Sequence, residues 1–516
     1  MNNIEHFVEI GIALSTENNH KALLEKILKS AMELSHADAG TIYSVENEQL
    51  VFDTVLNNSL NIHFGGTSGK RMTFPAIDIY KFGQVNSSAV AAVAAGNGSP
   101  INIDDVYTCH QYDLSAARAM DQKTGYHTQS VLTLPMKNHQ KELNGVIQLI
   151  NATNEQGQVI AFSQEVTRTV SALASMAAVI ITNKHLVDEM ENLFSAFSKL
   201  IASAIDKKSP YTGSHCRRVP EITMMMAHAC NDINRGPLAE FSMSDADFHE
   251  LSVAAWLHDC GKVATPEYIM DKSKKLETIF DRIELINARF EIAARDIYYS
   301  SKLSEPDKAL QLKQLEEDRK FLAEANTGGE FFDNEKVDRV YQIAHRHQVT
   351  IAGVSQNIIS DDELQNLIIA RGTLTTKERQ IINDHMKVTV EMLESMPFPK
   401  HLANVPEYAC GHHEKMDGTG YPKGLKRHEM STQARMMAIA DVFEALTAND
   451  RPYKPPKTLS ETLTIMGRMK LGNHLDPDLF DVFISEKVYL KFAQEFLEPS
   501  QIDDFDISQI PGYQQI

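Results

Sequence analysis

Glu250-Leu-Ser-Val-Ala-Ala-Trp-Leu-His-Asp-Cys-Gly-Lys-Val263 places an adjacent histidine and aspartate after an apolar run. His258 and Asp259 follow Leu251 at spacings i+7 and i+8, so we predict that the three share one face of a helix. A carboxylate on an apolar face is costly to bury unless a cation binds it. The segment therefore predicts a pair of metal ligands on the core face of a helix.

Further histidines and aspartates outside this segment have the same character. Asp441, in the stretch 435–446, lies beside Met437 and Ala438 at helical spacing, so its carboxylate also falls on an apolar face. Imidazole and carboxylate groups in such number are the ligands that a two-metal hydrolytic centre needs. The candidate ligands are His215, His258, Asp259, His385, His412, His413 and Asp441.

Length and composition indicate a soluble chain of several domains. Its 516 residues are too many for one core, and 43% hydrophobic with 23% charged residues is ordinary for globular proteins. The formal net charge of −19 argues against a nucleic-acid polymer as partner, because such polyanions bind basic surfaces. A small phosphate ester held by metals remains compatible with this charge.

The sequence predicts a cytoplasmic protein that does not enter a membrane. Five scattered cysteines without a CxxC pair fit a reducing compartment and give no thiolate metal site. The N-terminus lacks the basic and apolar regions of a signal peptide. The most apolar stretch, near 171–182, is too short to span a bilayer.

The first 182 residues have the pattern of an α+β domain. A helical pattern at 18–35 precedes strand-like runs at 40–45, 50–56, 130–136 and 143–150, and an apolar helix follows at 164–181. Ser130-Val-Leu-Thr-Leu-Pro-Met136 and Leu143-Asn-Gly-Val-Ile-Gln-Leu-Ile-Asn151 resemble paired strands of a GAF domain. The resemblance covers about residues 5–182 and implies a sensor domain with an unknown small ligand.

A connecting helix is predicted at 183–206. Its apolar residues alternate spacings of four and three, which is the a/d pattern of a coiled coil over about three heptads. The helix either lies on its own domain or pairs with a second copy, and its position after a sensor-like domain favours a homodimer. The residues of this pattern are Leu186, Met190, Leu193, Phe197, Leu200 and Ala204.

Five further segments, in order, resemble the HD-GYP branch of the HD phosphohydrolases over about residues 200–490. They are Tyr211-Thr-Gly-Ser-His-Cys-Arg-Arg-Val219, His258-Asp-Cys-Gly-Lys262, Gly372-Thr-Leu-Thr-Thr-Lys-Glu-Arg379 before His385, His412-His-Glu-Lys-Met-Asp-Gly-Thr-Gly-Tyr-Pro422, and Ala440-Asp441 through Asp450-Arg-Pro-Tyr-Lys454. The resemblance implies an all-α domain that hydrolyses cyclic dinucleotides.

The resemblance also assigns roles to individual residues. The seven candidates above become ligands to two divalent metal ions, with iron or manganese favoured and zinc compatible. Asp259 is expected to bridge the metals, because a carboxylate has two oxygens. Lys262 is expected to contact the phosphate and to assist catalysis with Asp259, and Arg451 and Lys454 resemble a second phosphate-binding pair. Tyr211 stands where some relatives have a glutamate that ligates a third metal, so two metals are expected.

An insertion of added helices is predicted at about 277–371. The expected architecture is a multidomain chain: an α+β GAF-like domain at 1–182, a connecting helix at 183–206, and an all-α HD-GYP domain at 207–516 with a helical insertion. In the insertion, Leu276, Ile279 and Ile283 begin an apolar helical stripe, and His345 and His347 are expected at the surface. The added helices are expected to form a lid or a dimer surface.

The predicted function is metal-dependent hydrolysis of a cyclic dinucleotide, regulated by the GAF-like domain. Cyclic di-GMP is the first candidate substrate, cut to the linear dinucleotide, with further cleavage to GMP left open. Since no base-reading residue can be identified from spacing, 3′3′-cyclic GMP-AMP is the alternative. A catalytically inactive dinucleotide receptor is the rival of a different class, although this chain keeps all seven candidate ligands and Lys262.

Overall fold

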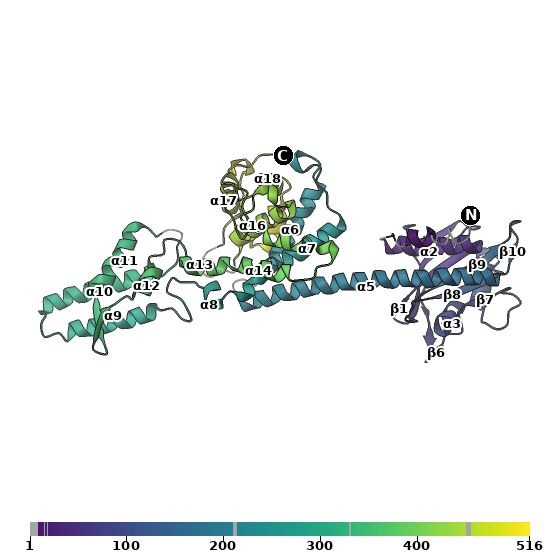
Figure 1. Cartoon of the computed structure of the whole chain (residues 1–516), viewed down its shortest axis with the longest axis horizontal. Coiled ribbons are helices and arrows are strands. Elements are labelled where there is room, and N and C mark those ends of the chain that lie inside the picture. Colours follow the sequence, from purple (N-terminus) through teal and green to yellow (C-terminus); the bar gives the residue numbers. More distant parts are fainter. Residues whose placement is uncertain are drawn as a thin grey trace. The chain divides into compact units, whose positions relative to one another are not determined.

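The computed structural model describes residues 9–14, 16–17, 19–209, 214–329, 332–449 and 456–515 (Figure 1). The chain divides into two compact units, Met1–Leu193 and Phe194–Ile516. The division falls inside one long helix, α5 (Gln164–Lys208), which contributes residues to both units. Each unit is described by itself below.

The first unit is built on an antiparallel sheet in the order β3-β2-β1-β9-β8-β7. Its strands are β1 (Ala37–Glu46), β2 (Gln49–Asn57), β3 (Ile62–Gly65), β7 (Ile101–Ile103), β8 (Val131–Lys137) and β9 (Leu143–Thr153). Short strands β4 (Ile77–Asp78) and β10 (Val159–Ile160) pair with β2 and β9, and β5 (Tyr80–Lys81) with β6 (Gln84–Val85) forms a separate hairpin. The central strand β1 is buried along most of its length, because helices cover both faces of the sheet.

Helices α2 (His20–Ser35) and α5 pack on one face of this sheet, and α3 (Val90–Asn97) packs on the other (Figure 1). The first face buries leucines of α2, such as Leu24 and Leu28, against Val170 and Leu173 of α5. The second face is closed by alanines of α3 and by residues that precede α4 (Ser115–Thr124). The predicted helices and strands of this unit are confirmed.

Helix α5 joins two helices that the sequence pattern separated at about residue 182. By length and composition alone, α5 is long and apolar enough to cross a membrane. Of its most apolar stretch of 18 residues, 33% is buried inside the structure. The stretch near 171–182, predicted to be too short to span a bilayer, is thus part of a longer helix. The apolar residues of its first half, including Leu173 and Ala177, lie in the core of the first unit, so this half of α5 is a core helix of that unit.

The second unit is mostly helical and has one large hydrophobic core. Its main helices are α6 (His215–Asp232), α7 (Asp245–Leu257), α8 (Glu267–Met270), α13 (Thr376–Asn383), α14 (His385–Glu394), α15 (Val405–Cys410), α16 (Thr432–Thr447), α17 (Leu459–Leu471), α18 (Pro477–Ser485) and α19 (Val488–Phe496). Short 3₁₀ turns connect them, of which η2 (Cys260–Ala264) is the one that matters for the site. The predicted fold class, an α+β domain followed by a mostly helical one, is confirmed.

The insertion has its own hydrophobic core. It contains α9 (Ile283–Tyr298), α10 (Glu305–Ala325), α11 (Asn334–Arg346) and α12 (Asp361–Leu367), with a hairpin of β11 (Gln348–Ile351) and β12 (Val354–Asn357) that was not predicted. The helix begins at Ile283 and not at Leu276, and Ile279 is exposed, although Leu276 is buried in the same core. His347 was wrongly placed at the surface, because it is half-buried, bonds to buried Asp318 at 2.9 Å and contacts the ring of Phe290.

Candidate metal centre

Most of the predicted ligands lie at helix ends. His215 is the first residue of α6, His258 is the C-cap of α7, and His385 is the first residue of α14. His412 and His413 follow Gly411, the C-cap of α15. Asp441 instead lies in the middle of α16, on the predicted apolar face. Because these ends meet in one region, residues separated by more than 200 positions in the sequence form a single cluster.

The predicted helix over 250–263 ends earlier, at Leu257. Asp259 leaves the helical conformation with φ −107° and ψ 14°, and the chain continues as η2. The reason lies in Gly261, where a Cβ atom would stand 2.0 Å from the carbonyl oxygen of His385. The backbone of this turn is therefore packed directly against the start of α14, and Gly261 N–H donates to Thr389 Oγ1 at 3.0 Å.

Asp259 lies between two groups of histidines. Its Oδ2 is 3.1 Å from His215 Nε2 and 3.2 Å from His258 Nε2. Its Oδ1 is 3.3 Å from His385 Nε2. The potential ligand atoms form two sets, and within each set the atoms lie within 4.8 Å of one another. One set comes from His215, His258 and Asp259, and the other comes from His385, His412 and His413. Asp441 Oδ1 lies 3.3 Å from His215 Nε2.

Three histidines have the same tautomer-fixing contact. The Nδ1 atoms of His258 and His412 lie 2.7 and 2.6 Å from the carbonyl oxygens of Ala255 and Ala409, and His385 Nδ1 contacts the carbonyl of Ile382. A carbonyl only accepts, so Nδ1 must carry the proton and Nε2 keeps its lone pair. Each acceptor is three residues earlier, in the last turn of a helix, where carbonyls lack helical partners.

A carboxylate orients the fourth histidine. His215 Nδ1 contacts the buried Glu444, and Arg218 Nε donates to the other oxygen of that carboxylate at 2.7 Å. A carboxylate behind a metal-binding histidine fixes the ring and raises its basicity. Glu444 and Arg218 were missed by the sequence reasoning, although each lies three residues after a predicted ligand on the same helix.

The electrostatics of the cluster favour binding of cations. Burial raises the pKa of Asp259 and Asp441, but neighbouring cationic groups outweigh it and hold both values well below the usual range. Burial, with a contribution from His413, lowers the pKa of His412 well below its ordinary value. The pKa of His413 is lowered to about 4, mainly by burial. Burial lowers the pKa of His215, but Glu444, Asp259 and Asp441 outweigh it and hold the value well above its usual range. The cluster therefore combines ionised carboxylates with the neutral imidazoles of His412 and His413, and ionised carboxylates and neutral imidazoles are the forms that bind metals.

The unpaired atoms of this cluster fit a bound metal. The Nε2 atoms of His258, His385 and His412 and Oδ1 of Asp259 are buried, and none has a hydrogen-bond partner among the residues that the structure describes. Buried polar atoms are nearly always paired. Four unpaired atoms in one cluster therefore indicate that a bound metal is their partner. Imidazole and carboxylate atoms without a thiolate suit iron, manganese or zinc.

Lys262 also lies in the cluster. It belongs to η2, not to a continuous helix with His258, and its Nζ is 2.5 Å from Asp259 Oδ2. Burial lowers its pKa, but Asp259 reverses this effect and raises the value above the usual range, so the side chain is a cation. Arg451, Lys454 and Tyr211 lie outside the described residues.

The loop after His413 is shaped by a residue that sequence reasoning also missed. The buried carboxylate of Glu414 accepts the backbone N–H groups of Lys423, Gly424 and Leu425 at 2.7 to 3.0 Å. A Cβ atom at Gly420 would lie 2.4 to 2.6 Å from the backbone of residues 414 and 415. This packing places the ring of Tyr421 in a stack on His413, with centroids 4.8 Å apart.

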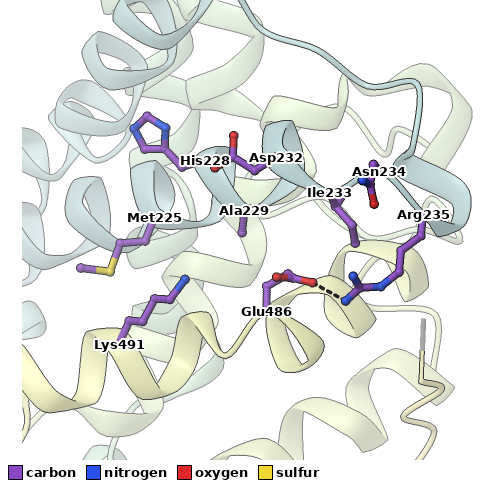
Figure 2. A pocket seen from close by; sticks show the side chains of 9 residues that line it. All are labelled: Met225, His228, Ala229, Asp232, Ile233, Asn234, Arg235, Glu486 and Lys491. Atoms are coloured by element: carbon purple, nitrogen blue, oxygen red, sulfur yellow. Dashed lines mark hydrogen bonds and ion pairs between the residues drawn. The ribbon is translucent and has the colours of Figure 1, made fainter.

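A separate cavity of about 290 Å³ lies elsewhere on the second unit, between α6 and α19 (Figure 2). The described residues that line it include Met225, His228 and Lys491, and none of them is a predicted ligand. Arg235, which also lines the cavity, is paired with Glu486 at 2.7 Å (Figure 2). The cavity is therefore distinct from the metal-ligand cluster.

Two family models match the chain. Residues 19–181 match the GAF domain and residues 341–479 match an HD domain, so the chain carries both. The HD match begins inside the insertion and omits His215, His258 and Asp259, which the insertion separates from the other ligands. The predicted resemblances to both families are confirmed.

Curated relatives match parts of the chain. A probable cyclic di-GMP phosphodiesterase of Vibrio cholerae is 34% identical over 168 residues, which cover 31% of this chain and 36% of that protein. The 3′3′-cGAMP-specific phosphodiesterase 1 of the same species is 44% identical over 80 residues, covering 16% and 18%. A cyclic di-GMP phosphodiesterase of Thermotoga maritima is 33% identical over 118 residues, covering 23% and 31%. The chain thus spans about a third or less of these relatives' length.

Among solved structures, the GAF domain of a phosphoenolpyruvate-protein phosphotransferase from Coxiella burnetii aligns with 37% of this chain and 98% of its own length, at 16% identity and a TM-score of 0.28.

Proposed function

We propose that this chain, which joins a GAF domain to an HD domain of the HD-GYP type, is a metal-dependent phosphodiesterase that hydrolyses a cyclic dinucleotide. The observation that carries the proposal is the carboxylate of Asp259, which turns one oxygen toward each of two groups of histidines. Curated relatives named as cyclic di-GMP phosphodiesterases support cyclic di-GMP as the substrate.

The proposed cofactors are two divalent metal ions, iron or manganese first. The residues that would hold them are His215, His258, Asp259, His385, His412, His413 and Asp441. Bound divalent metals supply Lewis acidity toward phosphate oxygens and lower the pKa of water, which is the chemistry that phosphodiester hydrolysis at neutral pH requires. The position of Asp259 between the two groups supports its role as the shared ligand.

Residues of the chain hold the substrate and stabilise developing charge. Lys262 reaches the ligand cluster with a cationic ammonium, so it is placed to contact a non-bridging phosphate oxygen. Arg451 and Lys454 remain proposed phosphate contacts on the strength of the sequence motif. The ring of Tyr421, fixed on His413, borders the same region and limits how a nucleotide can approach the centre.

A second substrate has specific support. Several curated relatives are named as 3′3′-cGAMP-specific phosphodiesterases, and one of them has the highest identity among the relatives described above. We therefore keep cyclic GMP-AMP as the alternative substrate and a cytoplasmic location as part of the proposal. The receptor without catalysis is less favoured, because the chain keeps all seven candidate ligands and Lys262.

The test is hydrolysis by the full-length protein, purified anaerobically and loaded with iron or manganese. We expect cyclic di-GMP to be cleaved to the linear dinucleotide, faster than cyclic GMP-AMP and cyclic di-AMP, and cleavage to stop when a chelator removes the metal. Chromatography of the products gives the rates and shows whether GMP forms. Binding without cleavage by protein that carries two metals would contradict the proposal and support a receptor.

Regulation through a dimer of α5 is part of the same proposal. The apolar residues of the a/d pattern are exposed, with Leu193 at 71% and Leu200 at 65%, whereas Ser198 and Ala202 on another side of the helix are buried. Exposed apolar stripes of this length are uncommon on monomers. A second copy in parallel would cover them by the heptad rule, and an unidentified small ligand of the GAF domain would act through that helix pair.

Charges placed in this stripe are expected to separate the dimer. Replacing both Leu193 and Phe197 with glutamate places like charges opposite each other in a parallel pair, so we expect a monomer in multi-angle light scattering. Asp188→Lys, an exposed position away from the stripe, is the control and is expected to stay dimeric. Wild-type protein that is already monomeric would refute the dimer.

A further inference from the structure

The last turn of α5 is bonded to the turn that carries Lys262. The ammonium of Lys208 lies 2.5 Å from the carbonyl oxygen of Val263, 2.6 Å from that of Thr265 and 3.3 Å from that of Lys262. All three acceptors belong to η2 or directly follow it. Lys208 therefore binds the backbone of η2. In these three contacts its ammonium touches no side chain of the candidate ligands.

The chemistry of this contact is specific. An ammonium has three donors, and here three carbonyls of one turn receive them. The carbonyl of Lys262 also accepts the backbone N–H of Thr265 at 3.1 Å. A cation at the end of a short helix is favoured by the peptide dipoles and by carbonyls that lack helical partners. Since Gly261 presses the other side of the turn against α14, η2 is held between α14 and the end of α5.

Other contacts fix the end of α5 beside the ligand-bearing helices. Ala202 and Ile205 are buried in the core of the second unit. The ammonium of Lys199 lies 5.5 Å from the ring centre of Trp256, two residues before His258.

We propose that Lys208 is a positioning residue of the phosphodiesterase: it sets the place of the Lys262 ammonium by fixing the backbone of residues 262–265. The inference rests on the proposed function and deepens it. Because α5 is the helix whose first half lies in the core of the GAF domain, a shift or rotation of its end moves the turn that carries Lys262. Lys208 is thus the point at which a change in α5 reaches the phosphate-binding cation.

The test compares Lys208→Met with Lys207→Met. Lys207 is the exposed neighbour, so its variant removes the same charge without touching η2. We expect Lys208→Met to lower kcat/KM about tenfold, equivalent to about 1.4 kcal/mol, with unchanged metal content. Lys207→Met is expected to match the wild type, and Lys208→Arg, which keeps N–H donors, is expected to retain more activity than the methionine variant.

A double-mutant cycle separates positioning from general stabilisation. If Lys208 acts through Lys262, Lys208→Met has no further effect in a Lys262→Met background. Fully additive losses, or an equal loss in Lys207→Met, would overturn the proposal.

Hydrogen exchange supplies a readout that does not depend on activity. The amides of residues 260–265 are expected to exchange faster in Lys208→Met than in Lys207→Met. If the wild type cleaves no dinucleotide, the proposed function fails, but exchange still reports on the turn. Unchanged exchange in Lys208→Met would overturn the positioning role even in a fully active enzyme.

Discussion

Replacing Asp259 with asparagine is expected to abolish hydrolysis and to lower the bound metal to one ion or none per chain. The amide keeps the shape of the carboxylate but loses its charge, and one of its two ends becomes an N–H₂ donor that cannot ligate. Loss of an outer partner of a metal ligand costs 10- to 100-fold. Loss of a shared ligand should exceed that range, so we expect kcat to fall by more than about 100-fold. Elemental analysis and initial rates measure the two effects.

Asp318→Asn is the matched control for this variant. Asp318 is an equally buried aspartate, in the separate core of the insertion, where it pairs with Arg346 at 2.7 Å and with His347. Its replacement is expected to reduce stability, because Arg346 and His347 lose their partner, but to leave metal content unchanged. An Asp259→Asn protein that keeps two metals would show that this carboxylate does not join the two sites.

The candidate site could be predicted largely from residue type and apolar context. His258, Asp259 and Asp441 each follow or lie in an apolar helical segment, where a charge needs a partner, and the fold brings them into one cluster with the other histidines. Their role as metal ligands stays a prediction. What the pattern could not supply is the pairing of Asp259 with particular histidines, because that depends on how helix ends meet in space.

Periodicity failed where packing overrides it. The spacing in 250–263 predicted one helix, but the contact between Gly261 and His385 ends that helix at Leu257. Periodicity carries no signal for a contact between segments more than 100 residues apart. The same limit hid Glu414, whose carboxylate accepts backbone N–H groups of a loop.

Glu444 and Arg218 could have been found from spacing. Each lies three residues after a ligand, Asp441 and His215, on the same helix, and neighbours at i+3 share a face. A second carboxylate, that of Glu444, beside Asp441 on an apolar face indicates a residue that orients a metal-binding histidine. Lys208 had no such signal, because its partners are backbone carbonyls of η2.

Glu444→Gln should therefore weaken metal binding although Glu444 is not a predicted ligand. The glutamine can offer its N–H₂ group or its oxygen to His215, so the ring is no longer held in one tautomer by a charged acceptor. The carboxylate behind a histidine ligand is worth 10- to 100-fold in affinity or activity, and we expect a loss of that size in both. Titration of the metal-free protein with manganese measures the affinity, and initial rates at saturating metal measure the remaining effect on kcat.

Glu363→Gln is the control for this prediction, since it removes an equally buried glutamate that pairs with an arginine, Arg289, away from the ligand cluster. It should cost stability but no metal affinity; equal losses of affinity in both variants would contradict the role of Glu444.

The pH dependence gives a further check. Burial raises the pKa of Glu444, but His215 and Arg218 lower it to about 2, from 4.5. A depressed pKa contributes stability that is present above the unfolded value and is lost as pH falls through the folded value. The difference in the free energy of unfolding between metal-free wild type and Glu444→Gln should therefore be full above pH 4.5 and shrink toward pH 2.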